Sequence, residues 1–242
     1  MMNEHTVTAY DDELKLLFRK VSEMGGLAER ITQQSVQALS NGDVSLAQAV
    51  IVEDAVLDRL QNEVDENAIL TIAKRQPMAM DLREIVAAIR ISGDLERVGD
   101  LGKNIAKRVI AVSDLFQPKS LMRGLEHLAE LGTLQLKDVL DAYSSRDAER
   151  AQMVWHRDEE VDQLHTAMFR ELLTYMMEDP RNITLCTHLL FCAKNIERIG
   201  DHATNIAETI HYVVTGEMFG ENRPKGDRAS EIALELDGEQ AG

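Results

Sequence analysis

Apolar side chains recur every three or four residues along most of the chain, which is the period of an amphipathic α-helix. Between residues 78 and 113, for example, Ile91, Leu95, Val98 and Ile105 share one face. The pattern stops only where Pro, Gly, Ser, Asn and Asp residues cluster. It predicts six long helices, over residues 8–40, 43–75, 78–113, 119–144, 147–178 and 180–215.

The breaks between these segments carry ordinary turn and capping signals. Prolines stand at positions 77, 118, 180 and 224, and proline is excluded from helix interiors. Turn residues fill 40–43 and 144–147, so Asp43 and Asp147 are expected to cap the helices that follow. Long helices joined by short turns run antiparallel to their neighbours, which predicts an all-α bundle.

The chain also repeats itself. A shift of 104 residues places Ala38–Asp58 on Ala142–Asp162, with eight of 21 positions identical. A shift of 101 places GDLERVGDLGKNIA (93–106) on KNIERIGDHATNIA (194–207). The sequence therefore predicts a tandem duplication of two antiparallel three-helix bundles. We expect the first repeat over residues 1–114, the second over 115–222, and a mobile tail over 223–242, where periodicity is weak.

Pairs of acidic residues four positions apart recur in both halves. The pairs are Asp54 and Asp58, Glu96 and Asp100, Asp158 and Asp162, and Glu197 and Asp201. Residues i and i+4 lie side by side on a helix, with Cβ atoms about 5–6 Å apart. Two antiparallel helices in each half would then bring four carboxylates together.

Such carboxylates can serve as metal ligands or simply form a solvated surface. Glu96 and Asp100 point away from the apolar face of their segment, so they are expected to be accessible to solvent, while Asp54 and Asp58 lie on the flank of theirs. Like charges at i and i+4 cost a helix about 0.2–0.5 kcal/mol, and a cation between them would offset that cost. Oxygen ligands suit Mg²⁺, Ca²⁺ and Mn²⁺ and tolerate iron. Matched positions in two diverged halves favour the interpretation that all eight acids are metal ligands.

A glycine recurs inside the third helix of each half, at Gly99 and Gly200. Glycine in a helix interior costs about 1 kcal/mol relative to alanine. Close helix packing is the favoured explanation, and room for a metal or a partner is the alternative.

Composition excludes several classes of protein. Only 4% of residues are aromatic, which argues against β-sandwiches and barrels. The formal net charge of −16 argues against binding nucleic acid. No run approaches 18 apolar residues and no signal sequence is visible, so no direct membrane insertion is expected. Cys186 and Cys192 are spaced too far apart on a helix to form a disulfide, which favours the cytoplasm.

Three segments carry a resemblance to a known family. They are HTVTAYDDEL (5–14), QPMAMDLREIVAAIRISGDLERVGDLGKNIA (76–106) and KNIERIGDHATNIAE (194–208). With the duplication and the acidic pairs, they resemble the PhoU family of regulators of bacterial phosphate transport. The resemblance covers about residues 1–218.

The resemblance implies a fold of two three-helix bundles with multinuclear metal clusters, holding divalent or trivalent ions such as iron, magnesium, manganese or zinc. It implies partners, namely the ATPase subunit of the phosphate ABC transporter and a phosphate sensor histidine kinase, which would recruit the protein to the inner face of the membrane. It also implies negative regulation of the phosphate-starvation response and modulation of phosphate uptake. Whether the chain forms a homodimer is left open.

Two other functions compete with a metal-binding adaptor that is not an enzyme. A dinuclear oxidase of the ferritin-like type needs two Glu-x-x-His motifs, and only Glu208 with His211 fits that spacing. Asp162 with His165 carries aspartate in place of glutamate. A metal-free helical scaffold, whose acids merely attract a basic partner, is the third hypothesis. No nucleophile context or glycine-rich phosphate loop suggests catalysis.

Overall fold

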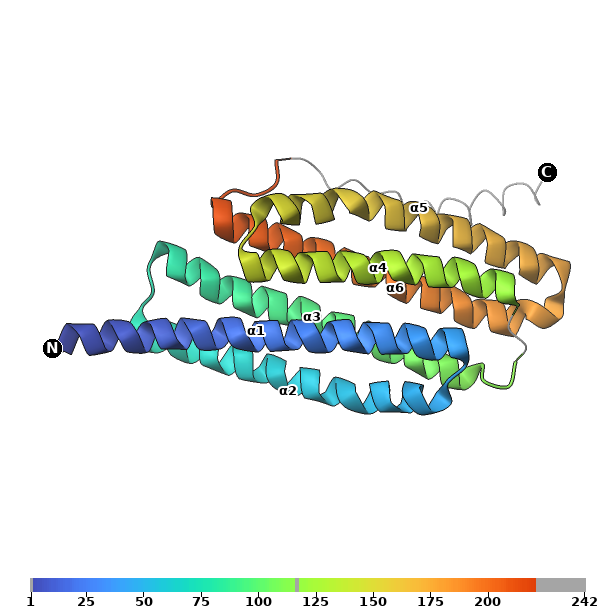
Figure 1. Cartoon of the computed structure of the whole chain (residues 1–242), viewed down its shortest axis with the longest axis horizontal. Coiled ribbons are helices and arrows are strands. Elements are labelled where there is room, and N and C mark those ends of the chain that lie inside the picture. The colour runs from blue at the N-terminus through green and yellow to red at the C-terminus, as the bar shows by residue number, and fades with distance from the viewer. Residues whose placement is uncertain (1, 116–117, 221–242) are drawn as a thin grey trace.

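The protein folds as six long α-helices in the computed structural model, which describes residues 2–115 and 118–220 (Figure 1). The helices are α1 (Met2–Asn41), α2 (Val44–Arg75), α3 (Ala79–Ala111), α4 (Lys119–Ser145), α5 (Ala148–Glu178) and α6 (Ile183–Thr215), with a 3₁₀ turn η1 at Pro180–Asn182. These residues contain no strand, so the predicted all-α class is confirmed. The predicted tail at 223–242 lies outside the described residues.

The helix ends follow the capping chemistry. Asp43 accepts a hydrogen bond from the backbone N–H of Leu46 at 3.0 Å, and Asp147 accepts one from Arg150 at 2.9 Å. Each bond satisfies one of the donors that a helix N-terminus leaves open. The C-terminus of α6 is capped by Gly216. The φ of this residue is 82°, in the left-handed region that glycine adopts without strain.

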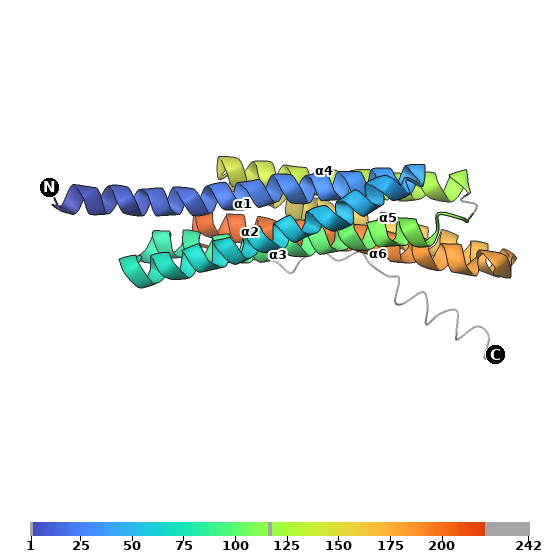
Figure 2. The same ribbon diagram turned by 90° about the horizontal axis from the view of Figure 1, so that it is seen from below.

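The helices assemble as two three-helix bundles that lie against each other (Figures 1 and 2). Helices α1, α2 and α3 contact one another, as do α4, α5 and α6. The bundles meet along α3 with α6 and along α1 with α4, while α2 and α5 lie on the outside. The tandem architecture is therefore confirmed. The division at residue 114 falls in the link between α3 and α4 and stays a prediction.

The contact between α3 and α6 is antiparallel. Arg83, near the start of α3, lies over the ring of Tyr212 near the end of α6, with 5.7 Å from its guanidinium carbon to the ring centre. Arg108, near the end of α3, lies 4.3 Å from the ring centre of Phe191, near the start of α6. The acidic pairs of the two helices therefore lie near the middle of the contact between α3 and α6.

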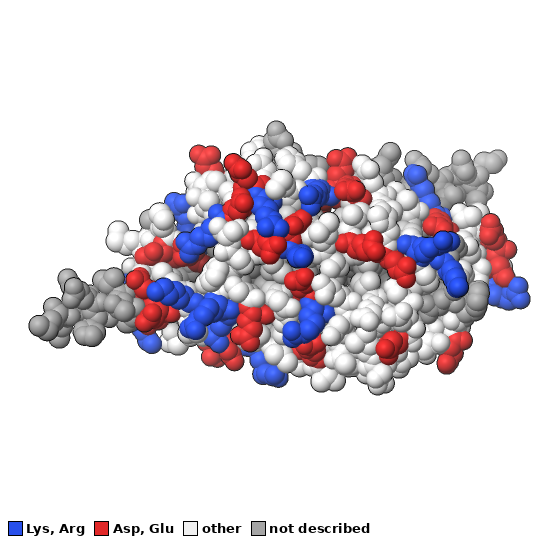
Figure 3. Space-filling model, in the orientation of Figure 1, with Lys and Arg blue, Asp and Glu red and all other residues white. Residues whose placement is uncertain are grey.

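Charge is distributed in a mixed pattern on the face seen in Figure 3, where acidic and basic side chains lie beside one another over both bundles.

No helix of the described residues is long and apolar enough to cross a membrane.

The pair of Glu13 and Arg75 gives the first bundle a testable pH dependence. The guanidinium donates to both carboxylate oxygens, at 2.9 and 3.0 Å, and joins α1 to the end of α2. The hydrogen bond from Arg75 holds the pKa of Glu13 below its ordinary value of 4.5, although partial burial opposes the shift. The stability that this ion pair contributes is therefore fully present above pH 4.5. It is lost as the pH falls through the pKa of Glu13 in the folded protein. We expect Glu13→Gln to lower the free energy of unfolding by about 1 kcal/mol at pH 7.

Urea denaturation at pH 7 and pH 3 measures this difference. The wild type and the variant should converge in stability at the acidic pH. An equal deficit at both pH values would show that the carboxylate charge contributes nothing.

Candidate functional site

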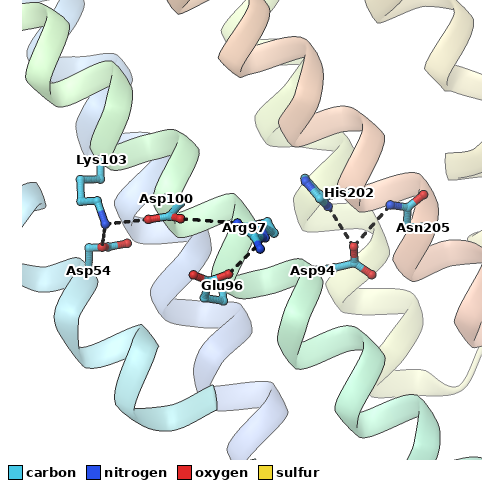
Figure 4. Close-up of polar contacts among 8 residues, drawn as sticks. All are labelled: Asp54, Asp94, Glu96, Arg97, Asp100, Lys103, His202 and Asn205. Atoms are coloured by element: carbon cyan, nitrogen blue, oxygen red, sulfur yellow. Dashed lines mark hydrogen bonds and ion pairs between the residues drawn. The ribbon is translucent and has the colours of Figure 1, made fainter. Parts of the chain in front are cut away.

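The first set of predicted ligands lies where α2 packs on α3, and Figure 4 shows three of its four members, Asp54, Glu96 and Asp100. Asp54 on α2 is 2% exposed, whereas Asp58, one turn later, is exposed. On α3, the side chains of Glu96 and Asp100 are 18% and 33% exposed. Both α3 acids thus reach solvent only in part, because α2 packs beside them. The prediction that Glu96 and Asp100 are accessible to solvent is therefore only partly met.

A lysine that the sequence interpretation did not single out connects these carboxylates. The Lys103 ammonium donates to Asp100 Oδ1 at 2.6 Å and also to Asp54 Oδ2 (Figure 4). Arg97 lies on the outer side, with Nε 3.5 Å from a Glu96 oxygen. Lys103 thus stands at the junction of the two helices, between one acid from each.

Two carboxylates of the first half, those of Asp54 and Glu96, have raised pKa values. Burial raises the pKa of Asp54, the hydrogen bond and charge of Lys103 oppose the rise, and the charges of Asp58 and Asp100 add to it. Burial also raises the pKa of Glu96, and the negative charge of Asp100 adds to it, with smaller contributions from Asp58 and Asp54. The acids of α2 and α3 in the first half therefore lie close enough to act on one another electrostatically, and their gathering around a metal ion stays a prediction.

The second set is more deeply buried. Asp158 on α5 is 2% exposed, Asp162 4%, and Glu197 on α6 4%, while Asp201 is half-buried. Lys194 donates to Glu197 Oε1 at 2.8 Å. The second half therefore buries three of its four acids, where the first half buries one.

Two neutral donors contact Asp158. Thr204 on α6 donates to Asp158 Oδ1 at 3.1 Å, and Gln135 Nε2 on α4 lies 3.3 Å from the same oxygen. The Gln135 amide also donates to the Thr204 hydroxyl at 3.2 Å. Three helices of the second bundle thus meet at one carboxylate.

The duplication shows how the two halves diverged at this point. Asp158 is the repeat counterpart of Asp54, and both are buried to the same degree. The shift that aligns α6 with α3 places Thr204 at the position of Lys103, and the shift of 104 places Gln135 on Ile31. In the first half an ammonium therefore contacts the buried aspartate, and in the second half a hydroxyl and an amide contact its counterpart.

The recurring glycines allow this close approach. A methyl group at Gly99 would overlap Leu57 Cδ2 and lie 3.0 Å from Asp54 Oδ1. A methyl group at Gly200 would lie 3.6 Å from Val161, the repeat counterpart of Leu57, and 2.8 Å from Gln135 Oε1. The structure supports close helix packing as the reason for both glycines, at the level of the buried aspartates.

Gly99→Ala is expected to destabilise the protein by about 1–3 kcal/mol, because the added methyl group overlaps Leu57, which is fully buried and would have to shift within the core. Gly26→Ala is the matched control, since this exposed helical glycine on α1 has nothing within 4 Å of the added methyl group. The control should gain up to about 1 kcal/mol from helix propensity. Urea denaturation followed by circular dichroism distinguishes the two, and a gain in both variants would contradict the packing explanation.

A polar junction between the two halves lies beside the first set. Asp94 on α3 contacts His202 Nδ1 at 2.9 Å and accepts from Asn205 Nδ2 at 3.3 Å, both on α6 (Figure 4). Glu96 and Arg97 line the same open groove, of about 560 Å³. Solvent therefore reaches Glu96, one member of the first set, from this groove. The sequence interpretation missed Asp94 because its repeat counterpart is Asn195, so it forms no matched pair.

The residues that suggested an oxidase have structural contacts. Trp155 Nε1 donates to Glu208 at 3.1 Å, and His211 stacks on Phe219 with ring centres 4.1 Å apart. Both side chains therefore take part in packing at the end of α6.

The donor chemistry of the carboxylate sets fits a hard cation. Asp54 Oδ1 is buried without a hydrogen-bond partner, and three further carboxylates act electrostatically on the same region. Among the described residues, however, no three His, Cys, Asp or Glu side chains are already gathered as a group that could hold a metal ion. The assignment of the eight acids as ligands stays a prediction.

The comparison with known proteins identifies the family. The model of the PhoU domain matches residues 21–109 and 125–210, one segment in each half of the duplication. The chain belongs to the PhoU family. The resemblance noted in the sequence is thereby confirmed.

Curated and solved members of the PhoU family resemble the chain over nearly its whole length. The phosphate-specific transport system accessory protein PhoU homolog of Rhizobium meliloti (strain 1021) is 62% identical over 98% of this chain and 100% of its own. The homolog of Caulobacter vibrioides (strain NA1000 / CB15N) is 53% identical over 95% of this chain and 100% of its own. The crystal structure of PhoU from Pseudomonas aeruginosa superposes with a TM-score of 0.84 at 35% identity, over 86% of this chain and 100% of that one.

Proposed function

We propose that this protein is a regulatory accessory protein of phosphate transport and not an enzyme. The observation that carries the proposal is 62% identity, across the full length of the relative, to a protein named for that role. In this role it represses the phosphate-starvation response when phosphate is plentiful and modulates phosphate uptake. It acts in the cytoplasm, at the inner face of the membrane, by linking the transporter's ATPase subunit to a phosphate sensor histidine kinase.

Deletion of the gene tests the regulatory proposal. A reporter of a phosphate-scavenging promoter should become active at high phosphate in the deletion strain, and the wild-type gene on a plasmid should silence it again. An unchanged reporter in the deletion strain would overturn the proposal.

We propose further that the carboxylate sets bind hard metal ions and that this binding belongs to the regulatory role. The support is the buried aspartate in each half and, in the first half, the approach of Asp54 of α2 and Asp100 of α3 to the same ammonium. Oxygen donors of this kind suit Mg²⁺, Mn²⁺ or iron. The metal-free scaffold is the alternative that an experiment must exclude.

Asp162→Asn tests metal binding, with Glu160→Gln as the matched control, because Glu160 is an exposed acid on the same helix. After incubation with Mn²⁺ and removal of free ion, elemental analysis should show less manganese in the Asp162 variant and an unchanged content in the control. Wild-type protein that retains no metal under these conditions would favour the scaffold.

A further inference from the structure

A half-open cavity lies where the two bundles meet, near the start of α3 and the ends of α4 and α6. Its walls come from these three helices and from α1, and the space inside, with its open mouth, is about 530 Å³. All lining residues except Glu84 and Arg146 are apolar or aromatic, and three of them, Leu17, Ala88 and Ile91, are at most 3% exposed. Apolar walls with a few polar groups are typical of sites for small molecules.

The duplication shows why the cavity is open. The shift of 101 residues that aligns α3 with α6 places Ala88, which lines the cavity, on Leu189, which is fully buried. Leucine is larger than alanine by an isopropyl group. The second half therefore fills with a side chain the position that the first half leaves small. Protein interiors keep few voids larger than a water molecule, so space retained between four helices indicates an occupant.

Polar side chains gather on the solvent side of the cavity. Arg146 Nη1, just after α4, lies 2.9 Å from Glu84 Oε1 on α3, and the arginine side chain is 61% exposed. Burial raises the pKa of Tyr143, the charge of Arg146 opposes the rise and the charge of Glu84 adds to it. The phenol of Tyr143 therefore lies close to both charged groups, and all three residues line the cavity.

The charged pair is particular to this copy of the repeat. Arg146 has a φ of 54°, in the left-handed region, and its counterpart under the shift of 104 is Gly42, with a φ of 63°. The chain thus carries an arginine where glycine would be free of strain. Glu84 falls on Leu185. Neither counterpart is charged, so the guanidinium and the carboxylate were placed beside this cavity only.

We propose that the cavity binds a free medium-chain carboxylate, of the class of octanoate, whose head group pairs with Arg146 in place of Glu84. A guanidinium matches a carboxylate with two parallel hydrogen bonds, and the apolar walls remove the alkyl chain from water. A membrane lipid with two acyl chains exceeds this volume. The ligand contacts helices of both bundles and therefore stabilises their contact. This inference does not depend on metal binding by the acidic sets.

Isothermal titration calorimetry of the full chain with octanoate tests the location of the site. Ala88→Leu reproduces the residue at position 189, fills the cavity and should abolish binding. Ala73→Leu is the matched control, because Ala73 is an exposed alanine on α2, and it should bind as the wild type does. If Ala88→Leu loses its helical circular dichroism, Val214→Phe decides, because Val214 lines the cavity and is 44% exposed.

The two members of the ion pair should change the affinity in opposite directions. Arg146→Gln removes the partner of the head group and should weaken octanoate binding about tenfold. Glu84→Gln removes the competing carboxylate and should strengthen binding by about threefold. Arg123→Gln is the matched control, because Arg123 is an exposed arginine at the other end of α4, and its affinity should not change.

Three results would overturn the inference. The first is a wild-type protein that gives no saturable heat with octanoate. The second is wild-type affinity in a folded variant whose cavity is filled or narrowed. The third is an equal loss of affinity in Arg146→Gln and Glu84→Gln, because the ion pair would then act only on the structure of the site. None of these results would alter the proposed regulatory role.

Discussion

Lys103→Met is expected to lower the free energy of unfolding by about 3 kcal/mol when divalent ions are removed by a chelator. The variant leaves the carboxylate of Asp54 buried between α2 and α3 without its cation. Removing one partner of a buried ion pair typically costs about 3–5 kcal/mol, because the remaining charge stays desolvated. We place the effect at the lower end because the Lys103 side chain is 22% exposed. Urea denaturation followed by circular dichroism measures the loss.

A double-mutant cycle identifies the cause of this loss. Asp54→Asn should cost only about 1–2 kcal/mol, since the lysine keeps Asp100 as a partner and reaches solvent. The double variant should cost about 2 kcal/mol, well below the sum of the single changes, because an amide does not require a nearby cation. Additive losses would show that Lys103 acts through packing of its alkyl chain and not through its charge.

Much of the fold could be predicted from the sequence, because the information is local. A 3.6-residue apolar period, Asp43 and Asp147 as caps, and proline at the breaks define helices without knowledge of tertiary contacts. The main error was the start of α1, which was expected near residue 8 and begins at Met2. No proline or glycine interrupts residues 2–7, so the helix continues before its apolar period becomes visible.

The candidate site could be predicted only in part. The four-residue spacing selected the eight acids as candidate ligands, since helix geometry alone places residues i and i+4 on one face, and their role as ligands stays a prediction. It did not predict that Glu197 would be buried while Glu96 remains partly exposed, because burial depends on what the neighbouring helices contribute. The exchange of Lys103 for Thr204 was visible in the repeat. The structural consequence of this exchange could not be predicted, because only the fold shows that each of the two residues contacts the buried aspartate of its own half.

Trp155→Ala is expected to destabilise the protein by about 3–5 kcal/mol, the typical cost of removing a large aromatic side chain from a core. Trp155 on α5 is 2% exposed. Its ring stacks on Phe219, with ring centres 5.0 Å apart, and its N–H donates to Glu208. Phe219 also stacks against His211 of α6, so the tryptophan holds the chain that leaves α6 against α5 and α6. Urea denaturation followed by circular dichroism checks the loss, because the variant has no tryptophan fluorescence.

Trp155→Phe separates packing from hydrogen bonding at this position. Phenylalanine keeps an aromatic ring against Phe219 but cannot donate to Glu208, so the expected loss is about 1–3 kcal/mol, the usual cost of a hydrogen bond to a charged acceptor. Phe219→Ala provides the complementary measurement, because it uncovers the only tryptophan and should shift its emission to longer wavelength in the folded protein. An unshifted emission would mean that Phe219 does not cover Trp155 in solution. The losses in the two Trp155 variants would then have to arise from α5 and α6 alone, because the segment after Gly216 would contribute nothing to the burial of the ring.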